Sequence, residues 1–155
     1  MGDAIRAEAE RRNMDPTGEN LGSLMLQLRK SRGEGVVAEL ITPRIQASKS
    51  DVVIVDGIRS NAEIDVFRGV GDVRILSVHA STNTRFDFLS RRRRRDDPKT
   101  PVAFAKRDAR ELKVGISNSI ALADETISNN CASKEELIRM AHDIIVRWAG
   151  HGRSS

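Results

Sequence analysis

The sequence predicts an α/β fold in which helices cover a parallel sheet. Short apolar, β-branched runs alternate with stretches whose apolar residues recur at helical spacing, a pattern typical of parallel sheets. A chain of 155 residues is long enough to bury one core. Apolar residues make up 39% of it and aromatic residues only 3%, so the core is aliphatic. We expect one domain over residues 1–150 and a frayed tail at 151–155.

The first fifty residues are predicted to be helical. A polar helix is expected over 3–12. Leucine and methionine residues at helical spacing predict a second helix over 21–32, and Gly33 ends it. A third helix over 37–45 contains Pro43, which should start, bend or interrupt it.

Strands and helices alternate after residue 50. The run 51–56 is short, apolar and β-branched, and Gly57 ends it, which is typical of a strand buried on both faces. Two further strands are predicted at 73–80 and 123–128. The helices expected in this part of the chain cover 61–68, 82–92, 101–113 and 134–149.

One short segment carries most of the net charge of +4. Five consecutive arginines, 91–95, precede Asp96 and Asp97, and two carboxylates cannot neutralise them all. Such a run is commonly a solvated face. Several guanidinium groups together can also close over a polyphosphate. Arg107 and Arg110 stand one turn apart on the next predicted helix and could reach the same ligand.

Two glycine, acid and arginine groupings are candidate phosphate sites. Ligands of open α/β sheets bind beyond the carboxyl ends of the strands. Asp56 is predicted to lie there, where it could hold Mg²⁺ through water while Arg59 reaches a phosphate. The alternative is a helix-capping acid and a surface arginine. Asp3 and Arg6 repeat the pattern at a loop-to-helix junction, where an N-cap aspartate is the simpler interpretation.

Composition disfavours several other classes of protein. The single cysteine, Cys131, permits no internal disulfide and fits a reducing compartment, so a cytoplasmic location is expected. No stretch reaches the ~18 apolar residues of a membrane span, so no membrane partner is expected. His142 and His151 lack partners at metal-ligand spacing, which argues against a structural zinc site.

Five sequence blocks resemble, in order, those of the P-loop nucleotide kinases. The blocks are MGDAIR, VVIVDGIRS, HASTNTRFDFL, RRDDPKT and ALADETISNN. Over essentially the whole chain the sequence resembles an archaeal family of P-loop NTPases that are similar to adenylate kinase and dephospho-CoA kinase. The resemblance implies a three-layer αβα fold around a parallel sheet, with ATP and Mg²⁺ as cofactors. It also implies phosphoryl transfer from ATP to a nucleotide-like acceptor, or ATP hydrolysis.

The resemblance implies roles for the two glycine, acid and arginine groupings. Residues 1–50 would be the acceptor-binding helices. Asp3 and Arg6 look like the acceptor-binding Gly-Asp-x-x-Arg of adenylate kinases, and Arg59 looks like their phosphate-binding arginine. Asp56 looks like the Walker-B-type acid and would position Mg²⁺ through water. The acceptor would be a nucleoside monophosphate or a molecule of the dephospho-CoA class.

The same resemblance makes residues 91–110 a basic lid region. Arg92, Arg94 and Arg107 would be its catalytic cations, neutralising charge during in-line transfer. The loop after the last strand would border the adenine base, as in dephospho-CoA kinase. Asn129 and Asn130 are therefore nucleotide-binding candidates.

The phosphate-binding loop of that family is absent from the sequence. A P-loop reads Gly-x4-Gly-Lys-Ser/Thr, and no glycine of this chain is followed by lysine. By the resemblance, about 30 residues that hold the first strand, the P-loop, the first helix and the second strand would precede Met1. The strands at 51–56 and 73–80 would then flank an empty central position. We expect these 155 residues alone to bind ATP very weakly and to show no turnover.

Two other functions stay open. The arginines at 91–95 could bind nucleic acid with a steep salt dependence, although the scarcity of stacking aromatic residues disfavours such a partner. A non-catalytic regulator could instead keep the acceptor pocket. It would bind a nucleoside monophosphate through Arg6 and Arg59 without Mg²⁺.

Overall fold

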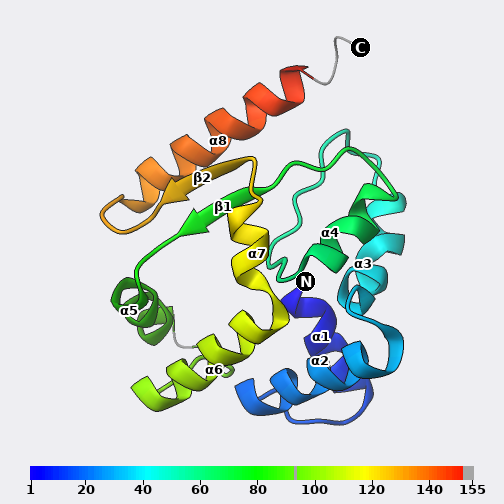
Figure 1. Ribbon diagram of the computed structural model, residues 1–155, viewed down its shortest axis with the longest axis vertical. Helices are drawn as coiled ribbons and strands as arrows, with labels where there is room; N and C mark the ends of the chain where they lie inside the picture. Colours follow the sequence, from blue (N-terminus) through cyan, green and yellow to red (C-terminus); the bar gives the residue numbers. More distant parts are fainter. Residues whose placement is uncertain (93, 152–155) are drawn as a thin grey trace.

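The computed structural model describes residues 1–92 and 94–151. Figure 1 shows α1 to α4 grouped on one side and the two strands on the other, with α7 between them. The helices are α1 (Gly2–Arg11), α2 (Gly18–Arg32), α3 (Val36–Gln46), α4 (Asn61–Arg68), α5 (Thr82–Arg92), α6 (Pro101–Val114), α7 (Ile116–Ala121) and α8 (Lys134–His151). The strands are β1 (Leu76–His79) and β2 (Glu125–Ser128).

The seven predicted helices are confirmed, with small shifts at their ends. Hydroxyl side chains begin five of them. Backbone N–H groups in the first turns of α2, α4, α5, α6 and α8 donate hydrogen bonds to Thr17, Ser60, Ser81, Thr100 and Ser133. The prediction missed α7, which follows α6 directly. Gly115 joins the two helices at φ +110°, a left-handed conformation that favours glycine.

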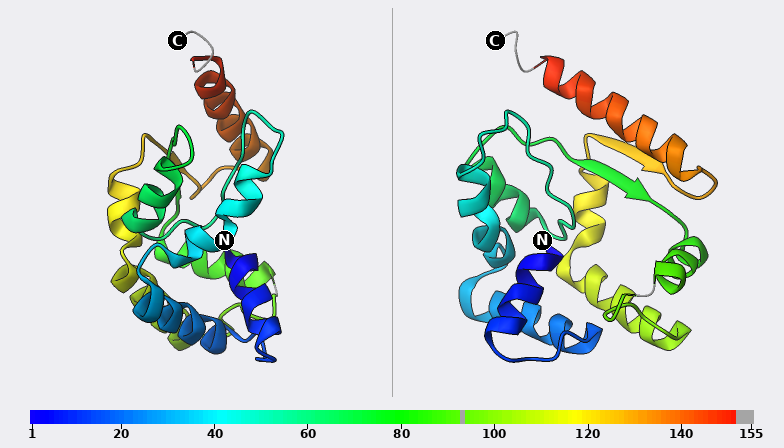
Figure 2. Two further views of the ribbon diagram at one scale, coloured as in Figure 1. Left: turned by 90° about the vertical axis from the view of Figure 1, so that its right-hand side faces the viewer. Right: turned by 180° about the vertical axis from the view of Figure 1, so that it is seen from behind.

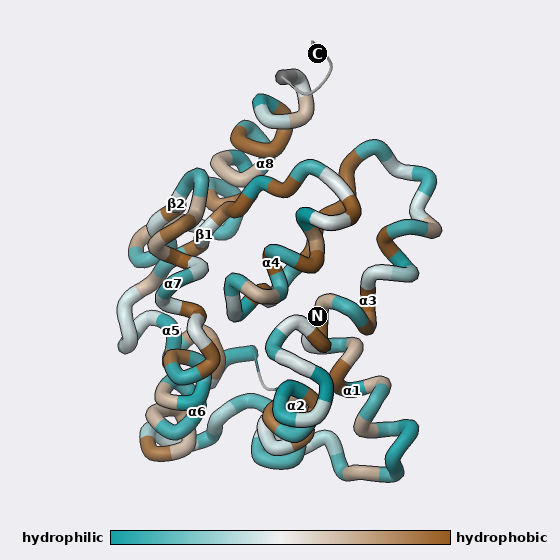
Figure 3. Tube along the Cα trace, turned by 45° about the vertical axis from the view of Figure 1, so that its right-hand side comes forward, coloured by the Kyte–Doolittle hydropathy of each residue, from teal (hydrophilic) through white to brown (hydrophobic). Residues whose placement is uncertain are grey.

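The largest buried apolar cluster joins α1, α2 and the start of α3. Figure 3 shows hydrophobic residues, in brown, recurring along these helices. The amphipathic spacing seen in the sequence therefore matches the faces that pack. The cluster consists of Ile5, Ala9, Leu21, Leu24, Met25, Leu28, Val36 and Val37.

The sheet holds two parallel strands in the described residues. Leu76 pairs with Glu125 and His79 with Ser128, so β1 and β2 run in register over four residues. The strands predicted at 73–80 and 123–128 are thus confirmed, although each is shorter than expected. Figure 2 shows from two further sides that α8 projects beyond this sheet.

The prediction of a strand at 51–56 is wrong. This segment lies in an irregular connection between α3 and α4. Val52, Val53 and Ile54 expose 48%, 42% and 73% of their surfaces, whereas a strand of a parallel sheet would be covered on both faces. A strand needs a hydrogen-bonded neighbour, and in the described residues β1 pairs with β2 alone. The β-branched residues of this segment favour an extended conformation, but they do not provide a neighbouring strand. The three-layer P-loop arrangement stays a prediction.

The C-terminal helix extends further than the sequence predicts. α8 reaches His151 instead of ending near 149. The rest of the predicted frayed tail, residues 152–155, lies outside the described residues. Within the described part of the chain, every helix is too short or too polar to cross a bilayer.

Candidate functional site

A cavity of about 750 Å³ lies where α1, α2, α6 and two connecting segments meet. Seven arginines and four carboxylates line it, an excess of three positive charges. Such a concentration of guanidinium groups in a concave site favours anionic ligands. The arginines are Arg6, Arg59, Arg92, Arg94, Arg95, Arg107 and Arg110. The carboxylates belong to Asp3, Asp56, Asp96 and Glu111.

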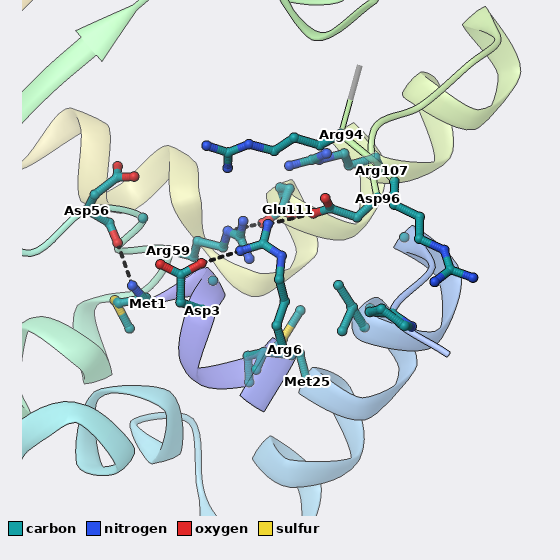
Figure 4. Close-up of a pocket in the computed structure, with 18 of the residues that line it drawn as sticks. Met1, Asp3, Arg6, Met25, Asp56, Arg59, Arg94, Asp96, Arg107 and Glu111 are labelled. Atoms are coloured by element: carbon teal, nitrogen blue, oxygen red, sulfur yellow. Dashed lines mark hydrogen bonds and ion pairs between the residues drawn. The ribbon is translucent and has the colours of Figure 1, made fainter. Parts of the chain in front are cut away.

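Helix α1 places Arg6 near the middle of this cavity. Its Nη1 lies 2.5 Å from Oδ1 of Asp3, one helical turn earlier, and its Nη2 donates to Oδ2 of Asp96 at 2.8 Å. Figure 4 shows Arg6 between these two acids, with Arg94 and Arg107 approaching from the side opposite α1. Arg6 is therefore held in place by carboxylates that an incoming anion could replace.

The segment before α4 supplies Asp56 and Arg59. Gly57 between them has φ +89°, which only glycine adopts readily, and it lines the cavity together with Asp56 and Arg59. The Nε of Arg59 lies 2.8 Å from Oε2 of Glu111 on α6. Asp56 has no ion-pair partner among the described residues, so its carboxylate can still accept a cation.

Asp97 organises the turn that follows α5. Its buried carboxylate accepts hydrogen bonds from the Arg92 side chain and, at 2.8 Å, from the backbone N–H of Arg94. Oδ1 of Asp97 lies 4.0 Å from Nη1 of Arg107. Burial raises the pKa of Asp97, but the bonds from Arg92 and Arg94 outweigh it and hold the pKa below its usual value. Burial lowers the pKa of Arg107, which stays charged.

The lowered pKa of Asp97 predicts an acid-sensitive contribution to stability. A carboxyl group whose pKa falls on folding stabilises the fold fully at a pH above its unfolded-state pKa, here 3.8. That contribution is lost as the pH falls below 3.8 toward the lower pKa of the folded state. Asp97→Asn should cost about 1–3 kcal/mol at pH 6 and progressively less below about pH 4. Thermal unfolding from pH 6 to pH 3 measures this difference.

A control variant separates this effect from general acid denaturation. Asp65→Asn removes an exposed ion pair with Arg68 on α4 and should change stability little at any pH. A difference between wild type and Asp97→Asn that stays constant down to pH 3 would contradict the assigned role of Asp97.

A buried ion pair between Glu63 and Arg29 holds the segment that contains Arg59. Glu63 accepts a hydrogen bond from the backbone N–H of Arg59 at 2.7 Å and also pairs with Arg29. The side chains of Glu63 and Arg29 are only 1% and 3% exposed. Burial raises the pKa of Glu63, while Arg59 and Arg29 lower it in part. The contact with the Arg29 guanidinium favours the ionised carboxylate at neutral pH.

Seven of the nine predicted site residues line the one cavity. They are Asp3, Arg6, Asp56, Arg59, Arg92, Arg94 and Arg107. Asn129 and Asn130 do not line it. Oδ1 of Asn130 accepts from the backbone N–H of Ser81 at 2.7 Å and so braces the turn after β1. Base contact by these two asparagines stays a prediction.

The sequence prediction missed three residues that shape the site. Glu111 has no local motif, because its partner Arg59 is distant in sequence. Glu63 had a usable signal, since Ser60 three residues earlier begins a Ser-x-x-Glu capping pattern. Arg29 had none, because its buried partner Glu63 lies 34 residues away in sequence.

Three archaeal relatives match nearly all of the chain. It is 43% identical to a UPF0200 protein of Hyperthermus butylicus over 152 residues, 98% of this chain and 81% of the relative. It is 39% identical to a UPF0200 protein of Pyrococcus horikoshii over 156 residues, with 96% and 84% covered. The chain belongs to the UPF0200 family. A UPF0200 protein of Staphylothermus marinus is 41% identical over 145 residues, with 94% and 76% covered.

The UPF0200 family name specifies no activity or ligand. No protein-family model matches the chain. The matches leave roughly a fifth of each UPF0200 relative outside the aligned region. The chemistry of the arginine-lined cavity therefore carries the functional assignment.

Proposed function

We propose that this UPF0200 chain provides the acceptor site and the transfer-step arginines of a nucleotide-kinase-like P-loop NTPase. The reaction would be transfer of the γ-phosphoryl group of ATP to a nucleotide-like acceptor, or ATP hydrolysis. Because these 155 residues contain no Gly-x4-Gly-Lys-Ser/Thr loop, we expect them alone to bind ATP weakly and to show no turnover. The observation that supports this function is the convergence of seven arginines on one cavity that also contains Asp56. A cytoplasmic location, where ATP and Mg²⁺ are available, is part of the proposal.

Arg6 and Arg59 are the proposed acceptor-phosphate ligands. Each already holds a carboxylate in bonding geometry, Asp96 for Arg6 and Glu111 for Arg59. A phosphate offers the same kind of oxygen acceptor with greater charge, and guanidinium groups bind it in the same planar way. Acceptor binding would exchange a protein carboxylate for a phosphate.

Arg92, Arg94 and Arg107 are the proposed transfer-step cations. In phosphoryl transfer the protein contributes mainly position and charge, since the transition state spreads negative charge over the moving group. These arginines come from the end of α5, the turn after it and α6. Asp97 holds two of them together. No covalent enzyme intermediate is required.

The residues present fit a water-mediated magnesium site at Asp56. Mg²⁺ is commonly held by one or two carboxylates together with waters and substrate phosphates. Asp56 offers one carboxylate without an ion-pair partner among the described residues. The described residues contain no cluster of three or more metal-ligating side chains, so ATP phosphates would have to complete such a site. Bound there, Mg²⁺ would supply charge neutralisation of those phosphates.

Calorimetric titration with AMP and with ATP tests the function. We expect AMP to bind and ATP to bind more weakly, with Mg²⁺ strengthening the ATP interaction. Asp56→Asn should abolish the Mg²⁺ effect and leave AMP affinity within about twofold, because the acceptor arginines are untouched. Arg68→Ala, an exposed arginine of α4, is the charge-matched control.

Other outcomes would point to the alternatives. Failure to bind either nucleotide would contradict the proposed function. AMP binding with no ATP binding at any Mg²⁺ concentration would favour a non-catalytic regulator. Tight, salt-sensitive binding of single-stranded nucleic acid without nucleotide binding would favour the nucleic-acid function.

A further inference from the structure

Two cavity arginines, Arg94 and Arg110, form no ion pair with a carboxylate of the described residues. The other five each lie within 4.0 Å of a carboxylate oxygen. Arg110 also has a buried Nε with no hydrogen-bond partner. Burying a guanidinium group in part without an ion-pair or hydrogen-bond partner is unfavourable in free energy. An anionic ligand that bonds to this group would offset that penalty.

Helix α2 is shaped to receive the Arg110 side chain. A Cβ added to Gly22 would overlap the Arg110 guanidinium, so the side chain rests where only glycine leaves room. One turn earlier, a Cβ on Gly18 would come within 2.8 Å of the backbone oxygen of Asp96. Two glycines at i and i+4 thus let Asp96 and Arg110 lie against successive turns of α2.

This placement separates Arg110 from the proposed acceptor phosphate. Asp96 marks the phosphate position, since its side chain bonds Arg6. The Arg110 guanidinium rests about one helical turn, roughly 5 Å, along α2 from the point where the backbone oxygen of Asp96 meets that helix. Apolar residues of that helix, Leu21 and Met25, also line the cavity. A ligand could therefore place an uncharged body against α2 and present anionic groups at two separate points.

We propose that Arg110 binds a second anionic group of the acceptor, distinct from the phosphate at Arg6 and Arg59. The acceptor would be a nucleotide with two separated phosphate groups. This inference rests on the proposed function, because it assumes that the cavity is the acceptor site. It makes Arg110 the residue that determines specificity for doubly anionic acceptors.

Three probe ligands distinguish a second site from simple charge attraction. AMP carries one phosphate, ADP carries its added charge on the same end, and adenosine 3′,5′-bisphosphate carries it at a separate point. We expect the wild type to bind the bisphosphate about tenfold more tightly than AMP or ADP. Arg110→Ala should remove that preference and leave AMP and ADP affinities within about twofold.

Gly22→Ala gives an independent variant with no change in charge. Its added methyl group would push the Arg110 guanidinium off α2, and alanine favours the helix, so the fold should be retained. The same selective loss of bisphosphate binding is expected. Circular dichroism checks that both variants are folded, and Arg68→Ala outside the cavity controls for loss of an arginine.

The failures of the two proposals look different. If the wild type binds none of the three nucleotides, the acceptor-site function itself fails. If it binds AMP but shows no preference for the bisphosphate, or if Arg110→Ala weakens all three equally, the second anion site is overturned and the proposed function stands.

Discussion

Glu63→Ala is expected to lower the free energy of unfolding by about 3–5 kcal/mol, the largest stability loss we predict. The substitution leaves the Arg29 guanidinium buried without its main partner, and Arg29 is only 3% exposed. It also removes the acceptor for the backbone N–H of Arg59. Urea denaturation followed by circular dichroism measures the change.

Glu34→Ala is the matched control for this prediction. Glu34 also pairs with Arg29, at 3.0 Å, but its side chain is 65% exposed. Exposed partners contribute little, so the variant should cost no more than about 1 kcal/mol. A double variant, Arg29→Met with Glu63→Leu, should recover much of the stability because it removes both buried charges. Equal losses of unfolding free energy for Glu63→Ala and Glu34→Ala would show that the buried ion pair contributes no more than the exposed one.

Arg59→Ala is expected to weaken AMP binding by about 10- to 100-fold, the largest effect on the site that we predict. Arg59 is held at two points, since Glu63 accepts its backbone N–H and Glu111 pairs with its guanidinium. A ligand phosphate therefore meets a cation that is already in position. Removing it loses charge-assisted hydrogen bonds and leaves Glu111 to repel the phosphate. Isothermal titration of AMP measures the loss.

Two further variants make the Arg59 result specific. Arg59→Lys keeps the charge and loses the planar fork, so it should retain only part of the affinity. Glu111→Gln should strengthen AMP binding, because the phosphate would no longer displace a carboxylate from Arg59. Unchanged AMP affinity in Arg59→Ala would contradict the acceptor role.

The helices were predictable because their signals are local. Apolar spacing within α2 and hydroxyl caps such as Thr17 and Ser60 need no information from distant residues. The segment 51–56 has the composition of a strand and is not one. A strand forms only when another segment supplies the ladder, and composition does not reveal whether such a segment lies alongside.

The site residues also separate into those that local sequence patterns predict and those that they do not. Local patterns identified Asp56, Arg59 and the arginines after α5, and these residues do line one cavity. The carboxylates that pair with the arginines were harder to predict. Asp96 reaches Arg6 across 90 residues of sequence, and the Arg29–Glu63 pair crosses 34. Such pairings depend on how the helices pack, which local spacing does not encode.

The carboxylates inside the cavity have a consequence for how ions compete for it. Bare arginine clusters draw a cloud of small anions from solution, and binding then releases those anions in proportion to the number of contacts. Here Asp96 and Glu111, which line the cavity, take the place of those anions at Arg6 and Arg59, and Asp97 does so at Arg92. The protein carries its own counterions, so ligand binding becomes an internal exchange of partners. At these paired arginines, discrimination between anions depends on how well each anion outcompetes a tethered carboxylate. Arg94 and Arg110 have no such partner among the described residues, so anion binding there stays sensitive to salt.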